Sequence, residues 1–271
     1  MRAVSAVGEG VWGWRAVKLV SLLVYIFMFA PIVVTMLLSF NDSQFGGFPI
    51  RGFSLRWFGV LFHNDIVLAA AQLSLEIGAV TAIICTVLGI LAALALVRYE
   101  FPGKDWVNAL MIAPVLIPET VLAVGLLLFL HWLHQPRTFL LLLMGHVMMS
   151  LPYVVLVVQA PLIGIKRVYE EAALSLGANR FQTFREVTLP LLMPAVLAGI
   201  LLAFTISFDN VTATLFWRPP GKETLPTQIY SMLHTSISPE INALGTLMII
   251  ITVGLPLLGG ALARALARSQ R

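Results

Sequence analysis

Three acidic side chains interrupt long apolar stretches of this chain, at Glu76, Glu119 and Asp209. A carboxylate near the centre of a bilayer costs roughly 2.5–3.5 kcal/mol on insertion scales, so it tends to face a cavity, a partner or a substrate. Asp209 belongs to a polar stretch that also holds Ser207, Asn210, Thr212 and Thr214. A negative group there can attract a cation that enters from outside. Alternatively, it is a hydrated carboxylate at the outer interface with a structural role.

The other two acids also allow two interpretations each. Glu119 follows Pro118, whose ring bends a helix and frees a carbonyl that needs a partner, so a pathway role competes with a structural one. Glu76 lies early in its apolar stretch, where it can instead sit at the level of the lipid headgroups. The predicted substrate pathway consists of Glu119, Ser207, Asp209 and Asn210.

Patterns for catalysis or cofactor binding are otherwise missing from the sequence. It contains no G-x-x-x-x-G-K-[ST] phosphate loop and no strand–turn–helix nucleophile elbow, so we expect no catalytic site. A zinc site at His131, His134 and His146 is disfavoured, because the first two lie where an interfacial turn is expected. The single cysteine, Cys85, excludes a disulfide framework within one chain. We expect no metal and no cofactor on this chain.

The elements that position these groups must be membrane helices. Of the 271 residues, 59% are hydrophobic and only 11% are charged, whereas ordinary globular proteins carry about 25% charge. Six stretches reach the length of about 20 residues that crosses a hydrocarbon core roughly 30 Å thick. They are 17–40, 68–97, 107–130, 139–159, 191–215 and 243–267. We predict an all-α polytopic membrane protein with six transmembrane helices, forming one domain over residues 1–271.

Lysine and arginine residues predict the orientation through the positive-inside rule. With the N-terminus inside, the inner segments hold twelve of them and the outer segments hold five. We therefore predict that both termini are cytoplasmic. The first stretch is longer than the signal-peptide core of about 7–15 residues, so we interpret it as a retained span. Nucleic acid binding is disfavoured, because the basic residues are scattered along the membrane edges without a run or an aromatic-interleaved patch.

Two long connections are expected on the outer side, at 41–67 and 216–242. The first is rich in glycine and aromatic residues and fits an external loop with an interfacial Trp57. The second contains several prolines and is either a plain surface or re-entrant loop, or a docking or gating surface. Prolines also recur within the spans, where each bends its helix, and such kinks suit helices that move.

A polar insert between Pro161 and Pro190 separates the fourth and fifth spans on the inner side. Its first half, 167–176, contains good helix formers and ends before Gly177, which can adopt the left-handed conformation of a helix C-terminus. Its second half, 179–188, begins with an asparagine suited to capping. Pro190 can then lie in the first turn of the fifth span, where its missing N–H costs nothing. These signals predict a helix–turn–helix bracket.

Periodicity alone leaves two interpretations of the bracket. The first half places Val168, Ala172 and Leu176 on one face, and the second half aligns Phe181, Phe184 and Thr188 on another. Such a bracket either docks another protein or lies as an amphipathic pair on the lipid headgroups. The second interpretation is favoured by the basic residues Lys166, Arg167, Arg180 and Arg185.

The insert contains Glu171-Ala172-Ala173, three residues, Gly177, nine residues and Val187-Thr188-Leu189-Pro190. This run resembles the EAA signature of permease subunits of bacterial ABC importers, from which only Val187 departs, standing where the signature has Ile. The resemblance implies a type I ABC importer fold in the bacterial inner membrane, with residues 161–190 docked in a cleft of a separate ATPase subunit. It assigns the coupling role to Glu170, Glu171, Ala172, Ala173, Gly177, Ala178, Leu189 and Pro190.

Further segments are similar to one branch of that family, the second permease of spermidine/putrescine importers. They are 25–40, 56–58, 113–119, 203–210, 224–226 and 242–244. The resemblance implies inward transport of a small amine-bearing, polyamine-like solute. It also implies partners: two ATPase subunits that carry ATP and magnesium, a second permease chain, an extracytoplasmic solute-binding protein and the lipid bilayer.

The chain departs from that branch at its acids. Members typically carry two adjacent acids where this chain has Asp209-Asn210, and an Asp where it has Glu119. The lost charge makes an amino acid derivative or an opine an alternative solute. Two other classes are a secondary transporter driven by an ion gradient and a membrane assembly protein. The first predicts inverted repeats that the sequence does not show, and the kinked spans and buried acids count against the second.

Overall fold

The computed structural model describes the backbone of residues 11–44, 46–235 and 239–269, with side chains from residue 14 to residue 261 within those ranges. The described chain is helical apart from its connections and one isolated bridge between Asn41 and Phe53. The helices are α1 (Val11–Ser39), α2 (Arg56–Leu61), α3 (Asp65–Arg98), α4 (Lys104–Leu116), α5 (Glu119–Trp132), α6 (Phe139–Gly164), α7 (Val168–Ser175), α8 (Arg180–Thr183), the π-helical η1 (Phe184–Thr188), α9 (Leu189–Phe208), α10 (Thr212–Trp217), α11 (Leu225–Thr235) and α12 (Glu240–Ser269).

Five helices within the described ranges are long and apolar enough to cross a membrane. The third predicted span, 107–130, is instead two helices, α4 and α5, which meet at an angle of 105°. Ile117 and Pro118 between them are both extended, with ψ of 131° and 132°. A residue that precedes proline is pushed out of the helical region, which ends α4 at this point. The six predicted spans thus correspond to five continuous helices and one bent pair.

The fifth span also differs from its predicted bounds of 191–215. Its helix begins at Arg180, inside the insert, and ends at Phe208. A short turn follows, and the remaining residues form the separate helix α10. The polar stretch that begins at Asp209 therefore leaves the span and turns back into the protein, which hydropathy alone did not predict.

Helices α3, α6 and α9 form the centre of the molecule and share one apolar cluster. They approach closely because small residues line their contacts. A Cβ atom on Gly89 of α3 would lie 2.7 Å from Val154 of α6, and one on Gly199 of α9 would lie 3.1 Å from the same side chain. In a bilayer, where apolar burial drives little association, such close packing is a main source of helix–helix stability.

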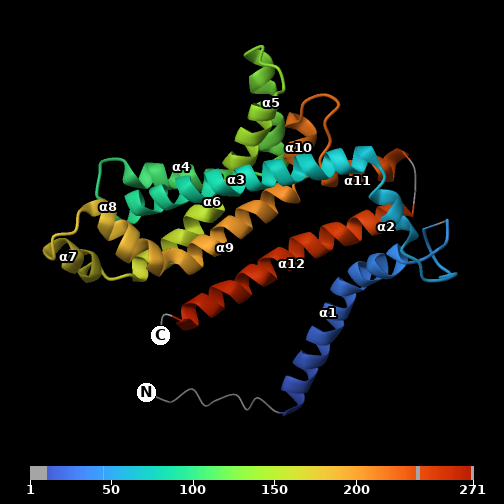
Figure 1. Cartoon of the computed structure of the whole chain (residues 1–271), viewed down its shortest axis with the longest axis horizontal. Helices are drawn as coiled ribbons and strands as arrows, with labels where there is room; N and C mark the ends of the chain where they lie inside the picture. Colours follow the sequence, from blue (N-terminus) through green and yellow to red (C-terminus); the bar gives the residue numbers. More distant parts are fainter. Residues whose placement is uncertain (1–10, 45, 236–238, 270–271) are drawn as a thin grey trace, which may run out of the picture.

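The chain runs back and forth between two ends (Figure 1). Helix α3 finishes beside the insert, and α12 starts at the opposite end and returns toward it. Asn41, at the end of α1, organises the outer connection: its side chain bonds the backbone of Ser43, Gly47 and Arg51, and its carbonyl accepts from the Trp57 indole at 2.9 Å. The predicted loop with an interfacial tryptophan is thus a folded cap that contains α2.

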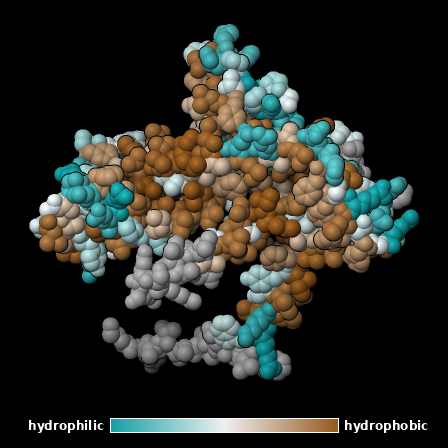
Figure 2. Space-filling view, in the orientation of Figure 1, coloured by the Kyte–Doolittle hydropathy of each residue, from teal (hydrophilic) through white to brown (hydrophobic). Residues whose placement is uncertain are grey.

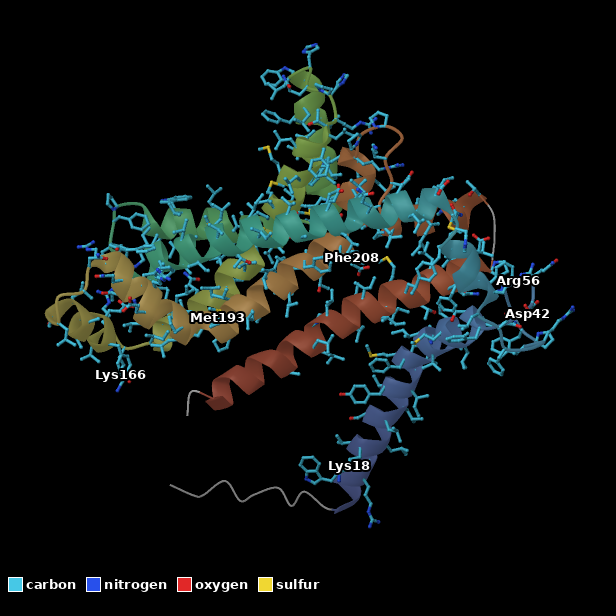
Figure 3. All side chains as sticks on the ribbon, in the orientation of Figure 1. Lys18, Asp42, Arg56, Lys166, Met193 and Phe208 are labelled. Carbon is cyan, nitrogen blue, oxygen red and sulfur yellow. The ribbon has the colours of Figure 1, made fainter. Side chains whose placement is uncertain are left out.

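The body of the molecule is apolar in its middle and hydrophilic toward its two ends, and the tip of α5 at the top of the view is hydrophilic as well (Figure 2). Lys166 lies at the end formed by the insert, Asp42 and Arg56 lie at the other end, and Phe208 lies between them (Figure 3). Side chains on α1 such as Phe27, which is 82% exposed, face outward without a covering element. This distribution fits a helical bundle whose long axis crosses the bilayer.

Candidate functional site

The glycine turn of the insert confirms the sequence prediction. Gly177 has a φ of 92°, and nothing lies within 4 Å of the position of a Cβ atom there. Its N–H bonds the Leu174 carbonyl at 3.0 Å, and the Ala178 N–H bonds the Ala173 carbonyl at 3.1 Å. These two bonds form the Schellman motif that closes a helix on a left-handed residue. The turn therefore sets the angle between α7 and α8, the helix that follows it.

The second half of the insert begins as predicted and then differs. Asn179 and Gln182 form a reciprocal capping box, with bonds of 2.8 and 2.9 Å. However, α8 does not end before the fifth span: it continues through the π-helical turn η1 into α9. The Leu189 N–H bonds the Phe184 carbonyl in that wide turn. We attribute the π turn to Pro190, which lacks the N–H that a regular ladder would use.

The outward side of α7 carries most of the residues of the EAA pattern. Glu171, Ala172 and Gly177 are exposed, Leu176 is 90% exposed, and Ala173 is half-buried. Ala178, Leu189 and Pro190 are also half-buried, nearer the body of the protein. The apolar face predicted for the first half of the insert therefore does not pack inward. It is available to a partner or to the membrane surface.

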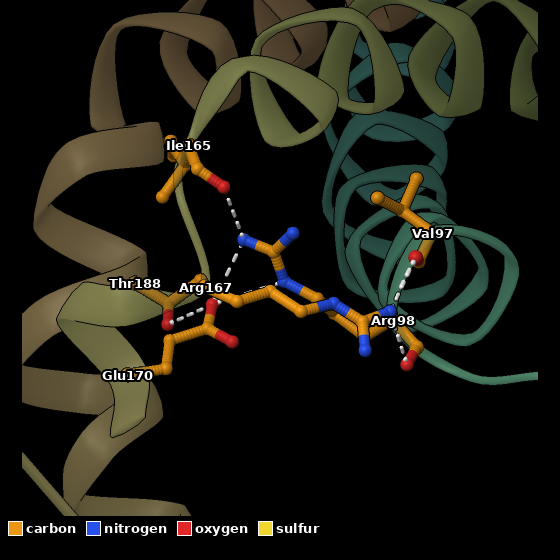
Figure 4. A network of polar contacts seen from close by, with 6 residues as sticks. All are labelled: Val97, Arg98, Ile165, Arg167, Glu170 and Thr188. Carbon is orange, nitrogen blue, oxygen red and sulfur yellow. Dashed lines mark hydrogen bonds and ion pairs between the residues drawn. The ribbon is translucent and has the colours of Figure 1, made fainter. Parts of the chain in front are cut away.

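A polar network joins the insert to the end of α3 (Figure 4). Glu170 Oε1 lies 3.0 Å from Arg98 Nη2 and accepts from Thr188 Oγ1 at 3.0 Å. Arg98 Nη2 also donates to the Ile165 carbonyl, and Arg167 Nη2 donates to the Arg98 carbonyl at 2.9 Å. Sequence reasoning included Glu170 but missed Arg98, whose position at the inner end of an apolar stretch was the available signal.

A second polar site lies at the break between α4 and α5. Asn210 Nδ2 donates to Glu119 Oε1 at 2.5 Å, while Asn210 Oδ1 accepts from the Thr214 N–H at 3.2 Å. The amide is thus oriented with its donor toward the carboxylate. A cavity of about 350 Å³ adjoins this pair and is also lined by Met149, Tyr153 and Ile206. The structure therefore brings together two of the four predicted pathway residues.

The other two predicted pathway residues, Ser207 and Asp209, do not line this cavity, and neither does the third acid, Glu76. Ser207 is buried against His146, whose Nδ1 lies 2.8 Å from Ser207 Oγ. Asp209 is exposed and is not among the described residues that line the cavity of Glu119. Glu76 accepts from Gln72 at 2.7 Å beside a different cavity. The acid that the sequence favoured most is thus separate from the acid that faces this cavity.

His146 links Ser207 to Thr214, and Thr214 bonds Asn210, which contacts Glu119. We call this series of hydrogen bonds, which sequence reasoning did not predict, the polar chain. Nε2 of His146 lies 3.1 Å from Thr214 Oγ1, and Thr214 Oγ1 donates to the Asn210 carbonyl at 2.8 Å. Because that hydroxyl has a single proton, Nε2 must be the donor, and the neutral imidazole then accepts from Ser207 at Nδ1. His146 is 2% exposed, so both hydroxyls bond it inside the protein.

No group of three or more metal-ligating side chains occurs in the described part of the chain. His146 uses both ring nitrogens in hydrogen bonds to hydroxyl groups. His131 and His134 lie on either side of the end of α5, at Trp132. The described residues thus form two candidate sites: the insert with its exposed apolar face, and the carboxylate–amide pair of Glu119 and Asn210 beside a cavity.

Comparison with known proteins relates the chain to transport components. It is 38% identical over 241 residues to the spermidine/putrescine transport system permease protein PotC of Escherichia coli K12, which covers 89% of this chain and 91% of that protein. It is 37% identical to the E. coli putrescine transport system permease protein PotI, over 87% of this chain and 85% of that one. The putative 2-aminoethylphosphonate transport system permease protein PhnV of Salmonella typhimurium is 31% identical, over 86% and 88%.

Solved structures support the expected fold. A bacterial ABC transporter that imports alginate matches with a TM-score of 0.73 at 17% identity, over 94% of this chain and 96% of that one. The inward-facing methionine transporter MetNI matches with a TM-score of 0.62 at 18% identity, over 74% and 96%. Residues 85–271 match the family of binding-protein-dependent transport system inner membrane components. The matched residues include the polar network, the insert and the residues from Glu119 to Thr214 that form the polar chain. This protein therefore belongs to the family of binding-protein-dependent transport system inner membrane components.

Proposed function

We propose that this chain is the permease subunit of an ATP-driven importer for a small amine-bearing solute of the polyamine kind. The contact between Glu119 and Asn210 beside a cavity carries the proposal, because it offers one negative charge to a cation within a bundle that hydropathy places in the membrane. PotC and PotI, which share more than a third of their residues with this chain over the aligned length, are named for spermidine and putrescine transport.

The cavity has further features that suit an ammonium group. Tyr153 presents an aromatic ring and Met149 a polarizable sulfur among its lining residues. An ammonium group gains roughly 0.5–2 kcal/mol over an aromatic face, more where water is excluded. Asn210 donates to Oε1 of Glu119, and we assign the other carboxylate oxygen, Oε2, to the ligand.

Partners supply what this chain lacks. Two separate ATPase subunits hydrolyse ATP with magnesium and dock on the insert through its exposed side, where Leu176 and Glu171 lie. A second permease chain completes the pathway across the inner membrane, and an extracytoplasmic binding protein delivers the solute to the end that carries the 41–67 cap. The four components together form the transporter, and this chain has no catalytic site of its own.

A singly charged or zwitterionic amine is the second candidate solute. Asn210 contributes no charge where the polyamine branch typically carries an acid, and Asp209 next to it does not line the cavity. PhnV is named for 2-aminoethylphosphonate, which carries one amine and one anionic group. An amino acid derivative or an opine likewise combines an amine with acidic groups.

Uptake measurements test the proposal directly. Cells that lack the gene are complemented with wild type, Glu119→Gln or the exposed control Glu100→Gln, and uptake of labelled spermidine, putrescine and 2-aminoethylphosphonate is followed. We expect wild type to restore uptake of at least one of these amines. Because a hydrogen-bonded charge is worth about 1.5–3 kcal/mol, Glu119→Gln should raise its apparent KM about tenfold or more. Equal uptake by both variants would remove Glu119 from the pathway, and no amine uptake by wild type would refute the proposed solute class.

A further inference from the structure

Helix α7 lacks an apolar anchor on the protein body. None of its residues, Val168–Ser175, is buried, and Val168 and Tyr169 are each more than half exposed. Helices of globular and membrane proteins are ordinarily held by an apolar face. Something else must fix the position of this helix relative to the spans.

Apolar packing does not fill the space between the insert and α3. A cavity of about 500 Å³ lies there, lined on the α3 side by Leu91 and Leu94 and on the insert side by Leu174 and Phe184. Because these side chains leave room between them, their dispersion contacts transmit little force. The polar network at the rim of the cavity is the direct connection.

That network has the features of a strong link. Glu170 Oε1 accepts from Arg98 Nε at 3.1 Å and from Nη2 at 3.0 Å, and the two side chains are 19% and 10% exposed. Charge-assisted hydrogen bonds shielded from water are stronger than neutral ones. The connection is also reciprocal: Arg98 reaches the Ile165 carbonyl before α7, while Arg167 reaches back to the last carbonyls of α3.

Helix α3 leads from this network to the polar chain at the α4–α5 break. Ile77 on α3 is fully buried in one cluster with Ala123 of α5 and Trp217 of α10. At 1.5 Å per residue, the 21 residues from Ile77 to Arg98 span about 30 Å. Since α5 carries Glu119 and α10 follows Asn210, a shift of α3 acts on both partners of that contact.

We propose that Arg98 and Glu170 are positioning residues that transmit movement of the insert to α3, and through α3 to the Glu119–Asn210 contact. The inference rests on the proposed function in that an ATPase moves the insert. It adds α3, which the insert reaches only through side-chain contacts, to α6 and α9, the spans that are covalently joined to the insert.

The mechanical link is tested on the full chain without any partner. Spin labels replace the exposed residues Val87 on α3 and Leu176 on the insert, and the buried Cys85 stays unlabelled. In lipid nanodiscs, wild type should give a narrow distance distribution. Arg98→Ala should broaden it at least twofold, the swap Arg98→Glu with Glu170→Arg should narrow it again, and Lys104→Ala, which breaks an exposed ion pair, should leave it unchanged. An equally narrow distribution in Arg98→Ala would overturn the proposal.

Transmission is tested in the assembled transporter. ATP hydrolysis and uptake of labelled spermidine are measured in proteoliposomes for the same variants. We expect Arg98→Ala to keep most ATP hydrolysis while uptake per ATP falls at least fivefold, with recovery in the swap. If Arg98→Ala does not assemble, Arg98→Lys is used instead. Lysine keeps the positive charge but cannot donate to Glu170 from two nitrogens, so we expect uptake per ATP to fall in this variant too.

The two possible failures are distinguishable. A wild-type chain that binds no ATPase subunit refutes the proposed function, whereas unchanged uptake per ATP in Arg98→Ala or Arg98→Lys refutes only the role of α3. If the uptake test identifies an amine other than spermidine as the solute, uptake per ATP is measured with that amine. If Arg98 had only a structural role, its variants would assemble in smaller amounts, but uptake per ATP would not change.

Discussion

At the scale of single residues, hydrogen-bond partners decide which polar groups can serve a ligand. Ser207 and Asp209 are two residues apart, yet Ser207 is bonded to His146 inside the protein and Asp209 is exposed. Neighbouring Asn210 contacts Glu119 across the break between α4 and α5. Residue types alone identify residues 207–214 as a polar stretch. The hydrogen-bond partners then show that Ser207 bonds a buried side chain, whereas Asn210 contacts a carboxylate beside a cavity.

His146 should be required for stability. Replacing it with Leu keeps the volume roughly similar but leaves the buried Ser207 hydroxyl without its partner. An unsatisfied buried polar group costs roughly 1–3 kcal/mol. We expect a loss of that size in the free energy of unfolding, measured with the purified chain in detergent. Adding Ser207→Ala should recover part of the loss, and a His146→Leu chain as stable as wild type would contradict this account.

At the scale of elements, local signals fix the helix ends of the insert and the tertiary structure fixes their consequences. The glycine turn and the asparagine cap are where the sequence predicts them. The π turn that follows continues the second helix into α9, so the insert is one free helix and the extended end of a span. We therefore expect a partner that pushes on α7 to act on α9 through the continuous chain and on α3 through the proposed Arg98–Glu170 link.

Gly177 and Gly164 provide a matched pair for this turn. Neither has a neighbour within 4 Å of an added Cβ, but only Gly177 has a positive φ. Gly177→Ala should cost about 1–2 kcal/mol, because L-residues avoid the left-handed conformation, whereas Gly164→Ala should be neutral or slightly stabilising. Local hydrogen exchange of the Ala178 amide, which the Schellman motif protects, should rise in the first variant only. Equal exchange in both variants would exclude a conformational role for Gly177.

At the scale of the whole molecule, the ends of the helices define two sides. The insert, the end of α3 and the described end of α12 lie at one side, and the Asn41 cap lies at the other (Figure 1). The terminal residues 1–10 and 270–271, on which the predicted orientation of the termini partly depends, lie outside the described residues. The positive-inside rule assigns the insert side to the cytoplasm.

Cysteine labelling tests that orientation. Lys166 on the insert side and Asp42 in the cap are both exposed and lie at opposite ends (Figure 3). With a membrane-impermeant maleimide on intact spheroplasts, Asp42→Cys should be labelled and Lys166→Cys should be labelled only after permeabilisation. The unaltered chain should stay unlabelled, because Cys85 is buried. The reverse pattern would invert the predicted topology.

The sequence by itself determined the membrane class, most span positions, the glycine turn and the family motif. These follow from composition and from interactions within a few residues, such as the capping box of Asn179 and Gln182. Tertiary structure alone decided that Arg98 pairs with Glu170 and that Asn210 rather than Asp209 meets Glu119. These contacts join residues 72 and 91 positions apart, so they depend on how helices pack, and no local pattern records that packing.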